Sequence, residues 1–326
     1  MINFHLMHKI MKIVDKYECS VVFLGDENQL PPIGIGEPFR YFMNCKSLPK
    51  MHLTQIHRQK DSYLKTAIKQ IIDDPSNVSI DEFDNRSIFF EDFSKKSYNL
   101  KTIQKIVSKY EIDEYNSKFI SPSNKKSSGV VELNKILQRI YNPHVGNSDH
   151  PDATNKTFAI LSSQYAMPKQ FMVDDLILLG TNISNTNDVN GDYFRIREIG
   201  GIKKVNNVDT YTEFTIKKVD DKNGEPKVVS NTEMYDDYDL GYCCTVHKTQ
   251  GSQYDTIVIV MDTEHQFQWG LDNGVNLLYT AISRAKNRCI IIGDKKMFYR
   301  ALFSGNDKSD ELLTTINRRI DESSFD

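Results

Sequence analysis

The hydrophobic pattern at the start of the chain predicts a helix, then a strand, then a polar loop. Apolar residues recur at three- and four-residue spacing between positions 7 and 14, which is typical of a helix with one apolar face. Residues 20–24 form a short run of branched and aromatic side chains that ends at Gly25. Such a run indicates a strand buried in a parallel sheet, so this order of elements predicts an α/β fold.

The middle of the chain continues this pattern more weakly. Residues 61–110 are polar and mainly helical in pattern, and residues 119–122 predict a strand that ends in a turn. Residues 129–141 predict a helix that stops at Asn142-Pro143. Residues 144–168 give no clear signal, and the tail after Lys308 is expected to be a short amphipathic helix or frayed.

Between Phe171 and Val229 the period changes to that of short strands separated by turn signals such as Asn190-Gly191. This pattern predicts a small barrel-like β domain inserted into the α/β fold. The expected strands of the insertion are residues 175–179, 193–197, 210–216 and 227–229. Two further buried strands are expected at 256–260 and 289–293, with a helix over residues 276–286 between them.

Composition narrows the class of protein only slightly. The chain has 326 residues, of which 39% are hydrophobic and 26% charged, as in an ordinary globular protein. Its net charge of -3 gives no sign of the strongly basic surface that is typical of nucleic-acid-binding proteins. Its five cysteines form no C-x-x-C pair, which argues against a zinc site or a disulfide framework. No signal-peptide layout or membrane-length apolar run occurs, so we expect an intracellular protein without a membrane partner.

Four blocks carry candidate chemistry: GDENQLPPIGIGEPF (25–39), LTQIHRQ (53–59), TVHKTQGSQYDTIVI (245–259) and LLYTAISRAKNR (277–288). A phosphoryl-transfer site needs a polar group near the γ-phosphate and cations that stabilise the transferring charge. Gln29, on a loop after a predicted strand, and two arginines, Arg58 and Arg284, provide such groups. Each of them alone is more often an ordinary surface residue.

In this order the blocks resemble motifs III, IV, V and VI of superfamily 1 DNA helicases, in the wording of the RecD-like branch (the exodeoxyribonuclease V alpha-subunit family). The intervening ISPSNKKSSGVVELNKILQRIYNP also resembles that family, and the likeness runs from near residue 1 to about 294. The resemblance implies a RecA-like, P-loop-NTPase-type parallel sheet with a small SH3-like insertion. The implied domains are 1–57 (remnant of the first motor domain), 58–169 with 239–326 (second motor domain) and 170–238 (insertion).

The resemblance also implies roles for individual residues. Gln29 matches the γ-phosphate sensor, and Asp26 is the neighbour that ties its loop to the site. Arg58 and Arg284 match the two arginines that reach the γ-phosphate across the cleft. In motif V, Gly251 lies in a turn that follows the state of ATP.

Gln253 stands where the family usually has Glu, although its carbonyl could still accept a hydrogen bond from the ribose. Thr245, His247 and Lys248 match positions that meet the DNA backbone, where contacts give grip without sequence preference. Asn134, in the segment before the insertion, is a further candidate for DNA contact. No residues of this chain are predicted to ligate a metal.

The sequence also departs from the family, because it has no G-x-x-x-x-G-K-[ST] and no D-E pair at the end of a strand. Met1 falls on the Met of the family's D-E-x-S-M motif. We therefore expect the C-terminal portion of an ATP-dependent helicase that moves 5′ to 3′ on single-stranded DNA. It would need ATP and Mg²⁺ together with a missing N-terminal half, in cis or in trans, and would be inactive alone. A DNA-binding module decayed from a helicase and one chain of a split two-chain motor are the alternatives.

Overall fold

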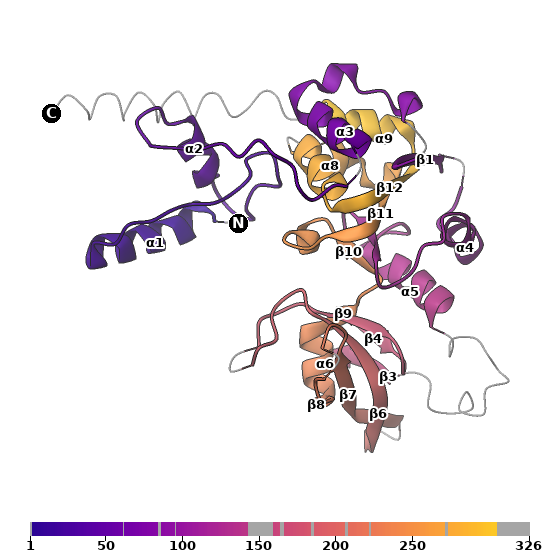
Figure 1. The fold of residues 1–326 in the computed structure, drawn as a ribbon. Helices are drawn as coiled ribbons and strands as arrows, with labels where there is room; N and C mark the ends of the chain where they lie inside the picture. The colour runs from indigo at the N-terminus through magenta and orange to yellow at the C-terminus, as the bar shows by residue number, and fades with distance from the viewer. Residues whose placement is uncertain are drawn as a thin grey trace. The chain divides into compact units, whose positions relative to one another are not determined.

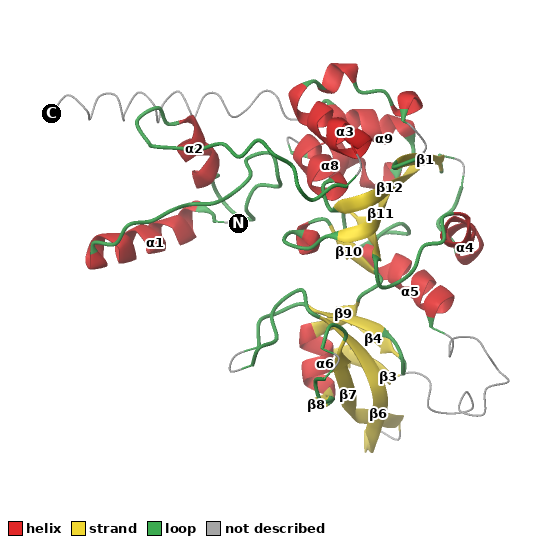
Figure 2. Cartoon of the chain, viewed as in Figure 1, coloured by secondary structure: helices red, strands yellow, loops and turns green. Residues whose placement is uncertain are grey.

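The computed structural model describes residues 2–60, 62–83, 86–94, 96–142, 159–163, 166–183, 186–205, 208–221, 223–270 and 273–304. The chain divides into two compact units. Their helices and strands are drawn in Figures 1 and 2. The first unit combines residues 1–94 with 261–326, and the second unit comprises residues 95–260. The tail after Lys308 and most of 144–168 lie outside the described residues, so the predictions made there stay predictions.

The first unit opens with the predicted helix, α1 (Phe4–Tyr17). The side chain of Asn3 caps it by accepting a hydrogen bond from the backbone N–H of Leu6 at 3.0 Å. The predicted apolar face is only partly used, because Met7 is the one buried residue of the helix. A second helix, α2 (Pro38–Asn44), begins with proline in its first turn, where a missing N–H costs nothing.

The prediction of a buried strand at residues 20–24 is wrong. These residues have no strand pairing in the structure, and the side chains of Val22 and Leu24 are 83% and 88% exposed. The run has the composition of an inner strand, but a strand is stabilised only by a neighbour that pairs with it. Among the described residues no neighbouring strand pairs with this segment.

The rest of the first unit is α/β. In chain order it contains α3 (Ser62–Asp73), η1 (Pro75–Asn77), η2 (Ile80–Glu82), β1 (Ile88–Asp92), η4 (Thr263–His265), α7 (Gln266–Gly270), α8 (Gly274–Ile282), β12 (Ala285–Gly293) and α9 (Lys295–Leu302). β1 was not predicted; it pairs in parallel with β12, with Ile88 opposite Cys289. The predicted strand at 289–293 and the predicted helix before it are both present, although α8 ends at Ile282 because β12 begins three residues later.

The second unit contains a parallel sheet with helices. Its elements are α4 (Leu100–Lys109), β2 (Ser117–Ser121), α5 (Val130–Tyr141), β10 (Cys243–Thr245), η3 (His247–Thr249) and β11 (Tyr254–Met261). β2 pairs in parallel with β10 on one side and β11 on the other, and every residue of β2 is buried. The predicted strands at 119–122 and 256–260, the helix at 129–141 and the α/β fold class are therefore confirmed.

An antiparallel β region lies within this second unit (Figure 2). It contains β3 (Ala159–Ser163), β4 (Ala166–Phe171), β5 (Leu176–Leu179), β6 (Tyr193–Val205), β7 (Val208–Lys218), β8 (Lys227–Ser230), α6 (Asn231–Asp237) and β9 (Tyr238–Leu240). The sheet order is β8-β7-β6-β5-β9, and β3 pairs with β4. All four predicted strands are present, whereas β3, β4, β9 and α6 were not predicted.

The β region has a hydrophobic core of its own. Edge-to-face ring pairs join Phe171 to Phe214 and Phe194 to Tyr238, with centroids 6.3 and 5.7 Å apart. A core separate from the parallel sheet agrees with a region that folds around its own centre. Across the described part of the chain, no helix combines the length and the apolar character that crossing a membrane requires.

Candidate functional site

The loop that contains Asp26 and Gln29 is built around one carboxylate. Oδ1 of Asp26 accepts a hydrogen bond from the backbone N–H of Asn28 at 3.0 Å, and Oδ2 accepts one from Nε2 of Gln29, also at 3.0 Å. The backbone N–H of Gln29 in addition donates to the carbonyl of Asp26 at 3.2 Å. Asp favours such turns because its short side chain bonds the backbone two residues on. The turn fixes where the amide of Gln29 lies.

This loop docks on one face of α8. Nδ2 of Asn276 donates to the carbonyl of Asn28 at 2.9 Å, and the hydroxyl of Tyr279 donates to Oδ2 of Asp26 at 3.0 Å. The backbone N–H of Leu30 donates to Oγ1 of a third α8 residue, Thr280, at 2.9 Å. Positions separated by three and four residues lie on the same side of a helix, so α8 presents these three side chains together.

Both candidate arginines lie at the C-terminal end of the same helix. Nη1 of Arg58 donates to the carbonyl of Ser283 at 2.8 Å. Nε of Arg284 donates to the carbonyl of Thr280 at 3.1 Å, and its Nη2 to Oγ of Ser283 at 3.0 Å. Gln59 reinforces this end by donating to the carbonyls of Ser283 and Ala285. The last carbonyls of a helix lack partners within it, and these side chains supply them.

The electrostatics of Tyr279 show how close these groups are. Burial raises the pKa of the Tyr279 hydroxyl, and the nearby carboxylate of Asp26 raises that pKa further. Arg284 and Arg58 act on the same pKa in the opposite direction. One hydroxyl thus lies within range of three of the residues that sequence motifs singled out. The structure brings Asp26, Gln29, Arg58 and Arg284 together around α8, in the first unit.

Tyr279 and Thr280 were not among the predicted site residues. They stand inside YTA-x-SRAK, so the motif contained them, but only its arginine was chosen. The available signal was helical spacing, because Asn276, Tyr279, Thr280 and Ser283 follow one another at intervals that keep them on one face.

The motif V residues are in the second unit, after β10. Thr245 ends β10, and its Oγ1 accepts a hydrogen bond from the backbone N–H of Lys248 at 3.4 Å. Gly251 has a φ of +89°, a left-handed conformation that favours glycine, and Gln253 follows it as an exposed residue. Burial lowers the pKa of His247.

Lys248 has an acidic partner. Its Nζ lies 2.8 Å from Oδ2 of Asp239, and Nζ of Lys169 lies 2.9 Å from Oδ1 of the same carboxylate. Although burial alone would raise the pKa of Asp239, these two lysines hold it below its usual value. A phosphate at Lys248 would therefore have to exchange with, or add to, an existing ion pair.

Asn134 is a buried residue of α5, not a surface one. Its Nδ2 donates to the carbonyls of Leu240 and Cys243 at 3.1 and 2.9 Å, and its Oδ1 accepts from the backbone N–H of Cys243 at 2.7 Å. These bonds fix the start of β10, which leads to Thr245. Direct contact of Asn134 with DNA stays a prediction. Its observed hydrogen bonds hold the start of β10, the strand that leads into motif V.

A second buried network, not predicted from the sequence, surrounds Asp175 beside these elements. Its carboxylate accepts hydrogen bonds from Gln138 at 2.6 Å, from Asn142 at 2.7 Å, from the backbone N–H of Met172 at 2.7 Å and from the hydroxyl of Tyr242 at 3.2 Å. Burial raises the pKa of Asp175 to about 6 despite these four donors. The network ties α5 to the start of β5 and to the segment before β10.

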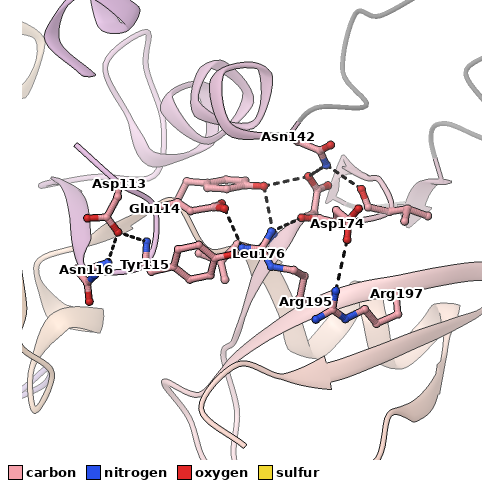
Figure 3. A network of polar contacts seen from close by, with 12 residues as sticks. Asp113, Glu114, Tyr115, Asn116, Asn142, Asp174, Leu176, Arg195 and Arg197 are labelled. Carbon is pink, nitrogen blue, oxygen red and sulfur yellow. Dashed lines mark hydrogen bonds and ion pairs between the residues drawn. The ribbon is translucent and has the colours of Figure 1, made fainter. Parts of the chain in front are cut away.

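Two ion pairs lie close to this network (Figure 3). Glu114 lies 3.0 Å from Nη2 of Arg195, and Asp174 lies 3.7 Å from Nη1 of Arg197. Burial raises the pKa of Glu114, while Arg195 opposes that shift. The Glu114–Arg195 pair joins the segment before β2 to the β region, whereas the Asp174–Arg197 pair lies within the β region.

Gln29, Arg58 and Arg284 carry amide and guanidinium N–H donors, the kind of group that binds phosphate oxygens. In the structure these side chains donate to Asp26, Ser283 and Thr280, respectively. The side chain of Arg284 is buried. Within the residues described, no group of three or more His, Cys, Asp or Glu side chains is placed to hold a metal ion.

Comparison with known proteins agrees with this layout. Residues 240–292 match the model of a UvrD-like helicase C-terminal domain, and residues 1–89 match that of an AAA domain. The chain is 23% identical to the RecBCD enzyme subunit RecD of Buchnera aphidicola over 365 aligned positions, covering 94% of this chain and 54% of that protein. It is also 23% identical to the ATP-dependent RecD2 DNA helicase of Deinococcus radiodurans, covering 84% of this chain and 32% of that one.

Solved structures share the fold. The Pif1 helicase of Candida albicans has a TM-score of 0.53 at 15% identity, with 98% of this chain and 75% of that chain covered. A Bacteroides Pif1 helicase in complex with ADP-AlF3 and ssDNA has a TM-score of 0.54 at 15% identity, with 97% and 72% covered. These likenesses support the RecA-like α/β fold. The chain spans about half of the RecD relative and about a third of the RecD2 relative.

Proposed function

We propose that this chain, a RecD-like superfamily 1 helicase in its C-terminal part, couples the state of a bound nucleotide to movement along single-stranded DNA. The observation that carries the proposal is the convergence of loop 25–32 and two arginines on α8. In a phosphoryl-transfer motor, catalysis is mostly positioning and charge stabilisation, which such donors provide. Movement 5′ to 3′ is the direction that the family implies.

In this function Gln29 senses the γ-phosphate, and Asp26 holds the sensing loop in shape. Arg58 and Arg284 stabilise the charge that develops on the transferring phosphoryl group. Gly251 and Gln253 act on the nucleotide side of motif V, where the φ of Gly251 lets the turn form. ATP, with Mg²⁺, supplies the free energy when it is bound, and this chain supplies the groups that read its terminal phosphate.

Single-stranded DNA is the proposed track. Thr245, His247 and Lys248 would contact backbone phosphates from the last residue of β10 and the short segment that follows it. Lys248 would then leave Asp239 or share it, so DNA binding and this ion pair are linked. Asn134 would act indirectly by holding β10 in place.

We also propose that this chain works with a P-loop-bearing segment, in cis or in trans. The sequence contains no P-loop, and residues 20–24 and 51–53 expose apolar side chains, with Met51 83% and Leu53 88% exposed. Exposed strand-like apolar segments mark surfaces that another chain segment covers. The proposed division is thus a remnant of the first motor domain at 1–57, a second motor domain at 58–169 and 239–326, and an insertion at 170–238.

The test uses the native protein isolated from its source. Its intact mass and peptide map show whether a P-loop travels with these residues, and DNA-stimulated ATP hydrolysis is measured on the same preparation. We expect a mass above 37.6 kDa, or a co-purifying P-loop protein, together with hydrolysis. A monomer of 37.6 kDa that binds single-stranded DNA and hydrolyses no ATP would replace this proposal with a non-catalytic DNA-binding module.

A further inference from the structure

We propose that Tyr279 is a positioning residue for the nucleotide-sensing loop: by holding Asp26, it sets the direction in which the amide of Gln29 points. This inference rests on the proposed function, because it concerns the same site. It adds a residue of motif VI to the control of a residue of motif III.

The carboxylate of Asp26 connects the two residues. Its Oδ2 accepts hydrogen bonds from both Nε2 of Gln29 and the hydroxyl of Tyr279, each at 3.0 Å. The Tyr279 ring is carried by α8, a regular helix, so its hydroxyl is a fixed point compared with an exposed loop carboxylate. The hydrogen bond from Tyr279 on α8 therefore sets the orientation of Asp26, and through Asp26 that of Gln29.

The other contacts of α8 with the loop do a different job. Asn276 donates to the backbone carbonyl of Asn28, and Thr280 accepts from the backbone N–H of Leu30. Both contacts hold the main chain of the loop, and neither reaches the side chain of Gln29. Of the described residues of α8, only Tyr279 hydrogen-bonds the side-chain pair of Asp26 and Gln29.

The hydroxyl is also kept in its donating form. Burial and the nearby Asp26 carboxylate both raise the pKa of Tyr279, so the phenol stays protonated at neutral pH. When the amide of Gln29 turns to a phosphate oxygen, Oδ2 of Asp26 keeps the hydrogen bond from Tyr279. Gln29 can therefore leave without stripping the carboxylate oxygen of its last side-chain donor.

The experiment is site-resolved amide hydrogen exchange on the nucleotide-free 326-residue chain, comparing Tyr279→Phe with the unchanged protein. We expect exchange of the Asn28 and Gln29 amides to speed up about ten-fold, the loss typical of one hydrogen bond to a charged group. The Leu30 amide, held by Thr280, should keep its protection. Tyr63→Phe is the matched control, because it removes a hydroxyl that donates to the carbonyl of Glu82, away from the loop.

A second readout follows the side chain itself. The side-chain amide resonance of Gln29 should shift in Tyr279→Phe and in Asp26→Asn, and the double variant should add little to either shift. Asp26 is exposed, so Asp26→Asn keeps the test available if Tyr279→Phe folds poorly. A purely structural role predicts that Leu30 loses protection together with its neighbours while the Gln29 resonance stays in place.

Two results would overturn the inference: unchanged exchange at Asn28 and Gln29, or equal loss of protection at Leu30. Neither measurement uses ATP or DNA, so each outcome is independent of whether the complete protein hydrolyses ATP. Conversely, a native protein without DNA-stimulated ATP hydrolysis would refute the proposed function and leave the exchange result standing.

Discussion

Replacing Asp175 with Asn tests the buried network that joins α5 to the β region. Oδ1 and Oδ2 of Asp175 each accept two hydrogen bonds, and all four partners are donors. In Asp175→Asn one of these oxygens becomes an NH₂ group, so two donors lose their acceptor. At pH 7.5, where the carboxylate is ionised and accepts all four bonds, we expect the free energy of unfolding to fall by about 1–3 kcal/mol, the usual cost of leaving buried donors unsatisfied.

The effect of Asp175→Asn on stability should depend on pH, because the carboxyl group of Asp175 titrates and an amide does not. Burial raises the pKa of Asp175 from 3.8 to about 6 in the folded protein. A raised pKa means that stability is fully present below about pH 4 and is lost as pH rises through about 6. The pKa of Asp175 in the folded protein exceeds its unfolded value by 6 − 3.8, or about 2.2. At 1.36 kcal/mol for each pH unit, this pKa difference corresponds to a loss of about 3 kcal/mol in the free energy of unfolding. Asn does not titrate, so Asp175→Asn lacks this loss.

The assay monitors urea unfolding by far-ultraviolet circular dichroism at pH 4.5, 6.0 and 7.5. These pH values bracket the pKa of Asp175, which is about 6. The margin by which the unchanged protein exceeds Asp175→Asn should be largest at the lowest pH and shrink as pH rises. Asp174→Asn is the matched control, because the Asp174 side chain is 35% exposed and lies 3.7 Å from Arg197. This substitution should change stability by less than about 0.5 kcal/mol. A margin that is constant, or that grows with pH, would refute the raised pKa and the account of the network.

Three further predictions concern function. Arg284→Ala or Arg58→Ala, introduced into the native protein, should reduce DNA-stimulated ATP hydrolysis by about 10³-fold or more, as measured by phosphate release; an unchanged rate would remove that arginine from the site. Lys248→Ala should weaken binding to single strands of any sequence and lower the salt slope of log K by about 0.7, measured by fluorescence anisotropy; sequence-dependent loss would contradict a phosphate contact. Leu53→Asp should leave thermal unfolding of this chain within about 0.5 kcal/mol of the unchanged protein but reduce association with a P-loop segment, and unimpaired association would count against that surface.

Much of the fold followed from periodicity, and the exceptions have physical causes. The helix at 129–141 and the strands at 119–122 and 256–260 were predicted because their apolar patterns match what they bury. β1 was missed because Ile88–Asp92 ends in two acidic residues and sits in a polar stretch. Only pairing with β12, which is distant in sequence, makes it a strand.

The candidate site could be predicted from the sequence as a set of residues, not as an arrangement. Gln29 and Arg284 could be chosen from their motifs, but no periodicity says that loop 25–32 rests on α8. Tyr279 was missed for the same reason, because its hydroxyl donates to the carboxylate of Asp26, which is 253 positions away in the sequence. Asp175 looked like the edge of a strand, and only its four donors make it the centre of a network.

The prediction that failed at residues 20–24 bears most on function. Val22 and Leu24 have the composition of an inner strand but are exposed, whereas Asp26, two positions later, is bonded to α8 in detail. If this part of the chain were simply misfolded, both the run 20–24 and the loop that contains Asp26 would lack partners, because the two are continuous. Instead the loop has its partner within this chain and the run has none among the described residues. The simplest physical account is that the partner of the run is another segment of sheet. We infer that it is the segment that brings the P-loop, since the role proposed for Gln29 requires a γ-phosphate to be held nearby.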